Sequence, residues 1–271
     1  MKKLKTNIQV SSWPNVTLPK KFETINLSAG KKSFIQERRL VKGKNYSDQI
    51  QIKLAAGSHL TYLLWQTDSL TIDSLRTRKF YLATNATCDV ITIWLGGKKS
   101  HLRQEVYLVG QGAKFRHYLL CLPRDQQTVR ILTSATHQAK NTQSQIISHR
   151  ALFGQSDSEV RGLINIAAQG QGSEGSFADQ VLAISQQAIN RSIPALAINT
   201  SEVKASHNSS QSAIAPVDLL YLQQRGISRS EAQSLLIRGF LARVYEGLIN
   251  PTVSREISAK IDKIIDHVQL S

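Results

Sequence analysis

Residues 153–166, FGQSDSEVRGLINI, contain a pattern that recurs through most of the chain. Between a glycine turn and a polar turn, apolar and polar residues alternate, which is typical of a strand with one buried face. Comparable runs are HLTYLLW (59–65), KFYLAT (79–84), VITIWL (90–95), EVYLVG (105–110), RHYLLCL (116–122), VRILTSA (129–135), VLAIS (181–185) and ALAIN (195–199). No stretch of helical period separates them, so the region predicts a mainly β fold: a sandwich, a barrel or a β-helix.

Two details favour a parallel β-helix. The connecting segments 137–145 and 167–176 are rich in Ser, Thr, Asn and Gln, which form side-chain ladders between stacked coils, and Asn-Gly and Asp-Gly, the strongest hairpin signals, are absent. At roughly twenty residues per coil, within the usual range for solenoids, the strand region would form about eight coils. Each coil buries its apolar face only against its neighbours, so both ends need a cover.

After Ile214 the apolar period changes from two to about 3.6 residues. Residues 216–226, PVDLLYLQQRG, predict a short helix that begins near Pro216 and is stopped by Gly226. Ser228 and Glu231 have the spacing of a capping box, which predicts the start of a second helix.

The second helix is expected to end at Asn250-Pro251, and a third to run from Ser254 to about Val268. The apolar stripe predicted for the second helix is Ala232, Leu235, Leu236, Phe240, Val244 and Leu248, and that for the third is Ile257, Ile261, Ile264, Ile265 and Val268. The chain thus divides into a basic N-terminal segment (1–30), a parallel β-helix (31–214) and a C-terminal helical domain (215–271), which we expect to seal the last coil.

The formal net charge of +15 is concentrated near the N-terminus, where residues 1–44 hold eleven Lys and Arg against Glu23 and Glu37. A basic stretch of this kind can bind nucleic acid, so a basic nucleic-acid-binding β-rich protein is one alternative. Aromatic residues do not interleave with the charges, however, and no helix-turn-helix, zinc-finger or RRM motif is present, which argues against a nucleic-acid partner.

Cys88 and Cys121 lie apart in apolar runs, without CxxC spacing or a histidine pair. They are expected to be reduced core residues, because free cysteine is among the most buried residue types. The apolar runs are too short for a membrane span, and the start MKKLKTNIQV is not followed by the apolar region of a signal peptide. These features predict a cytoplasmic protein without a membrane partner.

Two ordered segments carry a resemblance to a known family. EVKASHNSS (202–210), followed by PVDLLYLQQRGISRSEAQSLLIRGF (216–240), resembles the C-terminal hallmark of the SufB/SufD family of iron–sulfur cluster assembly proteins. Upstream, FGQSDSEVRGLINIAAQGQGS (153–173) and Pro194 fit the family's order of segments. Membership implies a right-handed parallel β-helix followed by helices, in agreement with the reading from periodicity.

The resemblance implies a scaffold rather than an enzyme. Such proteins pair through their β-helices, with a SufB-like paralogue or as a self-dimer, and dock a SufC-like ABC ATPase through their C-terminal helices. No cofactor is then bound stably, although a nascent iron–sulfur cluster would form transiently at the subunit interface. The chain contains no Walker A motif, so it is not expected to be the ATPase itself.

Within the family the chain looks closer to SufD. SufB-like members carry an assembly cysteine near the position that Asp179 occupies here, whereas His207 matches the histidine that in SufD-like proteins is a candidate iron ligand. Ala205 and Asn208 depart from the family pattern around that histidine, so either an assembly role or a structural role remains open for His207.

The resemblance also implies an ATPase docking surface. Its candidate residues are Tyr221, Arg225, Gly226 and Phe240. Each has a simpler structural reading, because Gly226 suits a helix C-cap and aromatic residues at helical spacing usually belong to a core. His117 and His149 are expected to be structural or surface groups, since no further ligand stands near them in sequence.

A third function, a β-helix enzyme acting on polysaccharide, requires a pair of carboxylates on one face. The acidic residues of the strand region, among them Asp89, Glu105, Asp125, Asp157 and Glu159, are scattered and form no convincing pair. This reading is the least favoured of the three.

Overall fold

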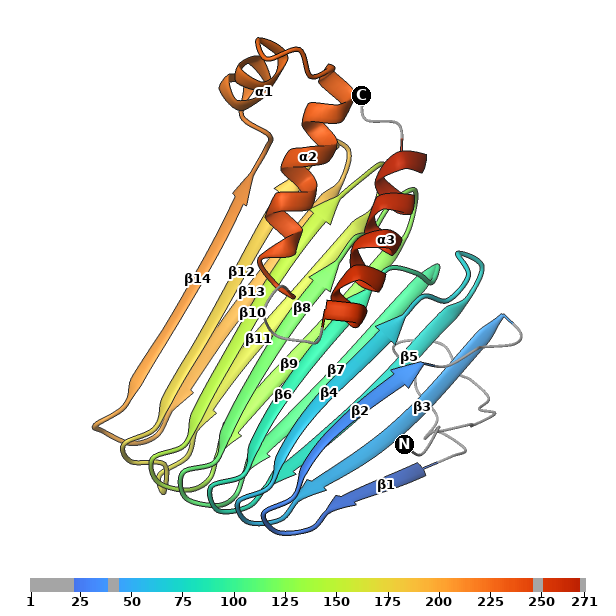
Figure 1. Cartoon of the computed structure of the whole chain (residues 1–271). Helices are drawn as coiled ribbons and strands as arrows, with labels where there is room; N and C mark the ends of the chain where they lie inside the picture. The colour runs from blue at the N-terminus through green and yellow to red at the C-terminus, as the bar shows by residue number, and fades with distance from the viewer. Residues whose placement is uncertain (1–21, 39–43, 246–250, 269–271) are drawn as a thin grey trace.

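The computed structural model describes residues 22–38, 44–245 and 251–268. Fourteen strands in this part of the chain form two parallel sheets that face each other, followed by three helices (Figure 1). Most of the basic stretch at residues 1–44 lies outside the described residues, including the start MKKLKTNIQV. The first strand begins at Phe22, inside the segment 1–30 that the sequence analysis assigned to the N-terminal region.

Sheet A contains the odd-numbered strands in sequential order. They are β1 (Phe22–Leu27), β3 (Asn45–Leu54), β5 (Asp73–Leu82), β7 (Lys99–Leu108), β9 (Thr128–His137), β11 (Asp157–Ile166) and β13 (Ile189–Ile198). Sheet B contains β2 (Lys32–Arg38), β4 (His59–Gln66), β6 (Thr87–Trp94), β8 (Lys114–Cys121), β10 (Gln143–Leu152), β12 (Glu174–Ala183) and β14 (Lys204–Ser212). The chain thus passes alternately through the two sheets, as a parallel β-solenoid does.

The repeat is longer than the sequence analysis predicted. Asp73 pairs with Lys99 and Asp157 with Ile189, so one turn of the solenoid takes 26 to 32 residues and not about twenty. The prediction of about eight coils is therefore wrong. Apolar runs recur every ten to twenty residues because each turn contains two strands, one in each sheet.

The interior between the sheets is built from the inward-facing residues of both. Tyr62, Phe80 and Phe115 lie in a row along it, in edge-to-face and tilted contacts with ring centroids 5.7 and 6.2 Å apart. Cys88 and Cys121 are free and buried here, as predicted, and burial raises the pKa of the Cys121 thiol to about 12.

Polar groups inside the solenoid are paired across the sheets. Arg78 donates to Asp48 at 2.7 and 2.8 Å and to Glu37, all three side chains being buried. Further along, His117 lies between Thr92 and Thr133 at 3.0 and 3.1 Å, and burial lowers its pKa to about 3, so the imidazole is neutral. This places His117 in the structural role that the sequence suggested.

One turn of every coil has the same conformation. Positive φ values recur at Gly30, Gly57, Asn85, Gly112, Asn141, Gly172 and Glu202. The N–H of each of the first six donates to a carbonyl in the next turn, as Gly57 does to Thr84 at 2.9 Å and Gly172 to Glu202 at 3.0 Å. Glycine and asparagine suit these positions because they tolerate the left-handed region best.

The C-terminal helices are α1 (Pro216–Gln223), α2 (Arg229–Ala242) and α3 (Pro251–His267). The predicted capping box is confirmed, since Glu231 N–H donates to Ser228 Oγ and Ser228 N–H to the Glu231 carboxylate. α2 ends at Ala242, before the predicted Asn250, and α3 begins three residues before the predicted Ser254; Leu248 lies outside the described residues. No described helix is long and apolar enough to cross a bilayer.

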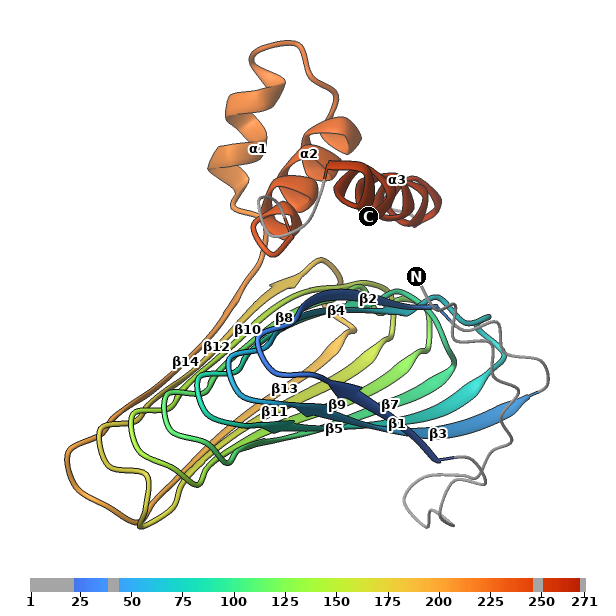
Figure 2. The same ribbon diagram turned by 60° about the horizontal axis from the view of Figure 1, so that its bottom comes forward.

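The helical unit does not seal the last coil. α2 and α3 lie across the outer face of sheet B, where Ile237, Leu241, Ile257 and Ile261 pack on apolar side chains of β4 to β12 (Figure 2). α3 reaches the first coils, where Glu256 pairs with Arg38 and Lys260 lies over the ring of Trp65. The prediction that these helices cover the end of the solenoid is therefore wrong.

The predicted stripe of α2 is shifted. Ala232 and Val244 are buried as expected, but Leu235 is exposed, and the buried positions between them are Gln233, Ile237 and Leu241. The stripe of α3 is confirmed at Ile257, Ile261 and Ile265, with Ile264 and Val268 partly buried beside them.

Candidate functional site

The last coil, made of β13 and β14, forms an open end of the solenoid. On one side β13 pairs with β11 and β14 with β12, and neither has a further strand on its other side in the described structure (Figure 1). The inward-facing residues of this coil are therefore not covered by a following coil. We call this surface the open coil.

His207 lies on the open coil. It is in register with Phe177, which is buried in the interior, so His207 occupies an inward-facing position that no following coil covers in the described structure. Ala205, two residues earlier, packs against the same interior cluster. The strand geometry thus presents the imidazole to whatever meets the end of the solenoid.

Asp179 has a different environment. Its side chain is buried and accepts from Arg150 Nε at 3.1 Å and from Arg150 Nη2, while Arg150 Nη1 donates to Ser158 Oγ at 2.8 Å. The open coil lies over this ion pair, because Ser209 is the register partner of Asp179. Asp179 thus holds the guanidinium of Arg150, which links sheet B to Ser158 of sheet A.

Apolar side chains are exposed along β13. They are Ile189, Ile193, Leu196 and Ile198, with exposed fractions of 37–47%. Leu196 and Ile198 continue the interior rows of Ile164 and Ile166, which are completely buried one coil earlier. A row that is core in one coil is therefore solvent-facing surface in the next.

The charges of the open coil are already paired with the preceding coil. Arg191 contacts Asp157 at 2.5 Å, and Lys204 contacts Glu174 at 2.8 Å. Burial alone would raise the pKa of Asp157, but hydrogen bonds from Arg130 and Arg191 outweigh it and lower that pKa. The two strands contain no other Lys, Arg, Asp or Glu, so the surface is nearly neutral.

The second candidate surface is α1, which projects away from the solenoid (Figure 2). Tyr221 is exposed at its tip, and the guanidinium of Arg225 lies 4.7 Å from its ring centroid. Gly226 follows with φ of +86°, and the N–H of Ile227 closes the helix on the carbonyl of Leu222 at 3.2 Å. Gly226 therefore acts as the C-terminal cap of α1.

The structure brings Tyr221, Arg225 and Gly226 together but separates Phe240 from them. Phe240 stacks on His149 of β10 with centroids 4.9 Å apart, and His149 Nδ1 donates to the Phe240 carbonyl at 3.0 Å. Burial beneath α2 lowers the pKa of His149. Phe240 and His149 thus hold α2 on sheet B.

Sequence reasoning missed the exposure of the apolar residues that share α1 with Tyr221. Val217 and Leu220 have exposed fractions of 69 and 55%. On α2, Leu235 is 50% exposed. The signal was available in α1, where Val217 and Leu220 precede Tyr221 within a single helical turn, while the buried Leu219 faces the other way. Exposed apolar groups gathered in this way mark interaction surfaces.

Metal-ligating groups are sparse around His207. Across residues 22–38, 44–245 and 251–268, His, Cys, Asp and Glu side chains form no group of three or more that could hold a metal ion. Within this described part of the chain, His207 therefore offers one imidazole and not a complete ligand set.

Comparisons with known proteins identify a family. Residues 24–240 match the family model described as the SufBD core domain of the SUF system for FeS cluster assembly. An iron–sulfur cluster assembly SufBD family protein of Synechocystis is 30% identical over 158 residues, which are 58% of this chain and 32% of the relative. The iron–sulfur cluster assembly protein SufD of Bacillus subtilis is 28% identical over 156 residues, 58% of this chain and 36% of the relative.

A longer match with lower identity covers more of the chain. A SufBD family protein of Mycobacterium leprae is 24% identical over 203 residues, 75% of this chain and 23% of the relative. The chain thus spans about a third or less of the length of these curated relatives. Because the family model covers most of the chain, including every strand after β1, this protein belongs to the SufB/SufD family of iron–sulfur cluster assembly proteins.

Proposed function

We propose that this protein is a SufD-like, non-catalytic scaffold subunit of an iron–sulfur cluster assembly complex. It pairs end to end through the open coil, with a SufB-like paralogue or with a second copy of itself. It docks a SufC-type ABC ATPase through α1 and the adjoining part of α2. The open coil, with interior rows left uncovered and His207 at one of the uncovered inward-facing positions, is the observation that carries the proposal.

The open coil has the properties of a pairing surface. It exposes backbone groups of two edge strands and an apolar row that would be buried if another coil followed. Exposed edge strands readily pair with another chain, and the near absence of unpaired charge removes the repulsion that would oppose such pairing. A partner with an equivalent open end would complete both cores at once.

The absence of an accessible thiol in the described structure supports the SufD-like assignment over a SufB-like one. Cys88 and Cys121 are completely buried, and burial raises the pKa of both thiols. A thiol that receives sulfur must be exposed and ionised, and these are neither. The match to the SufD of Bacillus subtilis is consistent with this reading.

His207 is the proposed contribution of this chain to the nascent cluster. A single neutral imidazole is a suitable ligand for iron, and the other ligands would come from the partner across the interface. The cluster is cargo that leaves the complex, so the site need not be complete within one chain.

Pairing is tested by co-expressing the tagged chain with an untagged SufB-like protein and a SufC-type ATPase and measuring their recovery. Leu196→Asp places a charge in the apolar row of the open coil and is expected to abolish recovery of the SufB-like protein. Leu70→Asp is the matched control, because Leu70 has nearly the same exposure, 38% against 37%, in a loop between β4 and β5. Equal recovery with both variants would contradict pairing through the open coil.

Docking of the ATPase is tested on the same complex. Leu220→Asp on α1 is expected to abolish ATPase recovery and leave the SufB-like partner bound. Val109→Asp is the control, since Val109 is also exposed, in the turn after β7. If Leu220→Asp and Val109→Asp retain the ATPase equally, the surface around Tyr221 is not the docking site.

The role of His207 is tested by the visible absorbance of cluster in the reconstituted complex. His207→Ala is expected to reduce cluster content at unchanged subunit recovery. Unchanged absorbance would assign His207 a structural role instead.

A further inference from the structure

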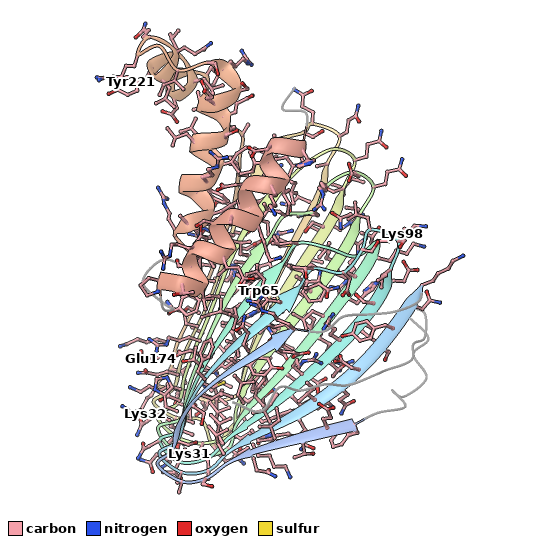
Figure 3. The ribbon with its side chains drawn as sticks, turned by 45° about the vertical axis from the view of Figure 1, so that its right-hand side comes forward. Lys31, Lys32, Trp65, Lys98, Glu174 and Tyr221 are labelled. Atoms are coloured by element: carbon pink, nitrogen blue, oxygen red, sulfur yellow. The ribbon has the colours of Figure 1, made fainter. Side chains whose placement is uncertain are left out.

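A groove of about 890 Å³ follows the outer face of sheet B near the starts of its strands, clear of α2 and α3. Its lining runs from His59 on β4 to Lys204 and Ser206 on β14. In Figure 3, Lys32 and Glu174 point outward together on this side of the molecule, below the helices, and Lys98 points outward on the far side. The groove ends at the open coil.

Cations recur along one register row that crosses the groove. Lys32 lies one strand before the first lining residue, His59, and is paired with it; the row continues through Thr87, Lys114, Gln143 and Glu174 to Lys204. Side chains in one register row of a sheet point the same way, so these groups form a line across seven strands.

The groove has an excess of positive charge. Arg116 is neutralised by Asp89 through bonds of 2.5 and 2.9 Å, and Lys204 is paired with Glu174. Lys32 and Lys114 form no ion pair with any residue that the structure describes. An anionic ligand therefore meets two unpaired ammonium groups, with a third at Lys204 shared with an exposed carboxylate.

The shape of the groove suits an extended chain. Lys32 and Lys204 are separated by six strand spacings of about 4.8 Å, or roughly 29 Å, the length of about nine extended residues at about 3.3 Å each. Uncharged donors and acceptors lie between the cations and can bond the backbone of such a chain: Thr87, Gln143, Gln145, Ser176 and Ser206.

The lining favours polypeptide over single-stranded nucleic acid. Single-strand binders combine cations with exposed aromatic rings on which bases stack. Phe115 is the one Phe, Tyr or Trp among the described lining residues, and its side chain is buried in the solenoid interior, while the imidazole of His59 is bound to Asp89 at 2.9 Å. The cations are therefore present without a stacking surface.

We propose that this groove binds an extended acidic polypeptide segment of a partner protein, with its carboxylates on Lys32, Lys114 and Lys204. The segment would lie next to the open coil, because the groove ends at β14. The inference uses a different face from the one proposed for pairing, so either can fail without the other.

The test uses the whole chain and a fluorescein-labelled nine-residue peptide of alternating Glu and Ser, followed by anisotropy at low salt. Lys114→Glu is expected to weaken binding at least about fivefold, the scale of one lost surface charge pair plus one new repulsion. Lys98→Glu makes the same charge change at an exposed position outside the groove and is expected to change affinity less than about twofold. Glu174→Gln should strengthen binding, because it releases Lys204.

Three results would overturn the proposal. The first is that the peptide does not bind. The second is that Lys98→Glu weakens peptide binding as much as Lys114→Glu does, which indicates a general charge effect. The third is that a nine-nucleotide oligothymidylate displaces the peptide and binds more tightly, with the same dependence on Lys114. Lys204→Glu, at the other end of the row, provides a second variant if Lys114→Glu alters the circular dichroism of the protein.

Discussion

The next-to-last coil and the open coil have the same strand pattern and opposite environments. Ile164 on β11 is completely buried, whereas Leu196, its register partner on β13, is 37% exposed. The Arg150–Asp179 pair is buried, whereas Lys204 and Glu174 meet in solvent. One more coil would convert the second environment into the first, so the same row of side chains is core inside the solenoid and exposed surface at its end.

The largest contrast is expected between the two ion pairs. Asp179→Ala leaves Arg150 charged and without its carboxylate in the interior, and should lower the free energy of unfolding by about 3–5 kcal/mol. Glu174→Ala removes the exposed pair between Glu174 and Lys204 and should change the free energy of unfolding little. Urea unfolding of the two variants measures the difference, and similar midpoints would show that the interior pair is not isolated from water.

The next contrast concerns the apolar row. Ile164→Ala truncates a completely buried side chain and should lower the free energy of unfolding by about 2–5 kcal/mol. Leu196→Ala is expected to lower the free energy of unfolding by only about 1–2 kcal/mol in the unpaired protein, because this residue is already 37% exposed and its truncation encloses no cavity. If the two costs are equal, the open coil is covered in solution, and adding the partner should then leave the Leu196→Ala value unchanged.

Acidic pH should destabilise the fold through a buried histidine in the central coils. His117 has an ordinary pKa near 6.5 when unfolded and about 3 when buried, so below pH 6.5 the unfolded chain binds the proton preferentially. Stability is therefore highest above pH 6.5 and falls between pH 6.5 and 3, by about 1.4 kcal/mol per pH unit from this group. His117→Gln should reduce that slope in unfolding measured across this pH range; an unchanged slope would show that water reaches the imidazole.

The smallest effect is expected in the helical unit. Ser228→Ala removes the side-chain acceptor of the capping box and should lower the free energy of unfolding by about 1 kcal/mol. Ser230→Ala is the neighbouring control, since Ser230 does not cap the backbone. Thermal unfolding followed by helical circular dichroism compares them, and equal loss would mean that packing on sheet B alone holds α2.

Local features of the fold were predictable because they depend on neighbouring residues. The capping box at Ser228, the glycine cap at Gly226 and the alternation of the strands each identified an element correctly. The repeat length was not predictable from the same patterns, since an apolar run does not show to which of the two sheets it belongs. The stacking of parallel coils decides that, and it is a long-range property.

The position of the helical unit could have been anticipated from sheet B. In β4, Tyr62 and Leu64 face the interior while Leu63 and Trp65 face the helical unit, so the run is apolar on both faces. Continuous apolar runs indicate strands buried on both sides. His207 was singled out by resemblance, and its exposure follows from the absence of a next coil in the described structure, which no local pattern encodes.

The distance along the chain between Trp65 and α3 has a consequence for biosynthesis. Lys260 closes over Trp65 only after roughly 195 further residues have been added, which takes about 10–40 s at ordinary rates of translation. Until then the apolar outer face of sheet B is exposed to solvent on the ribosome-bound chain. Molecular chaperones that shield nascent polypeptides should therefore engage this protein early and release it once its tail has emerged.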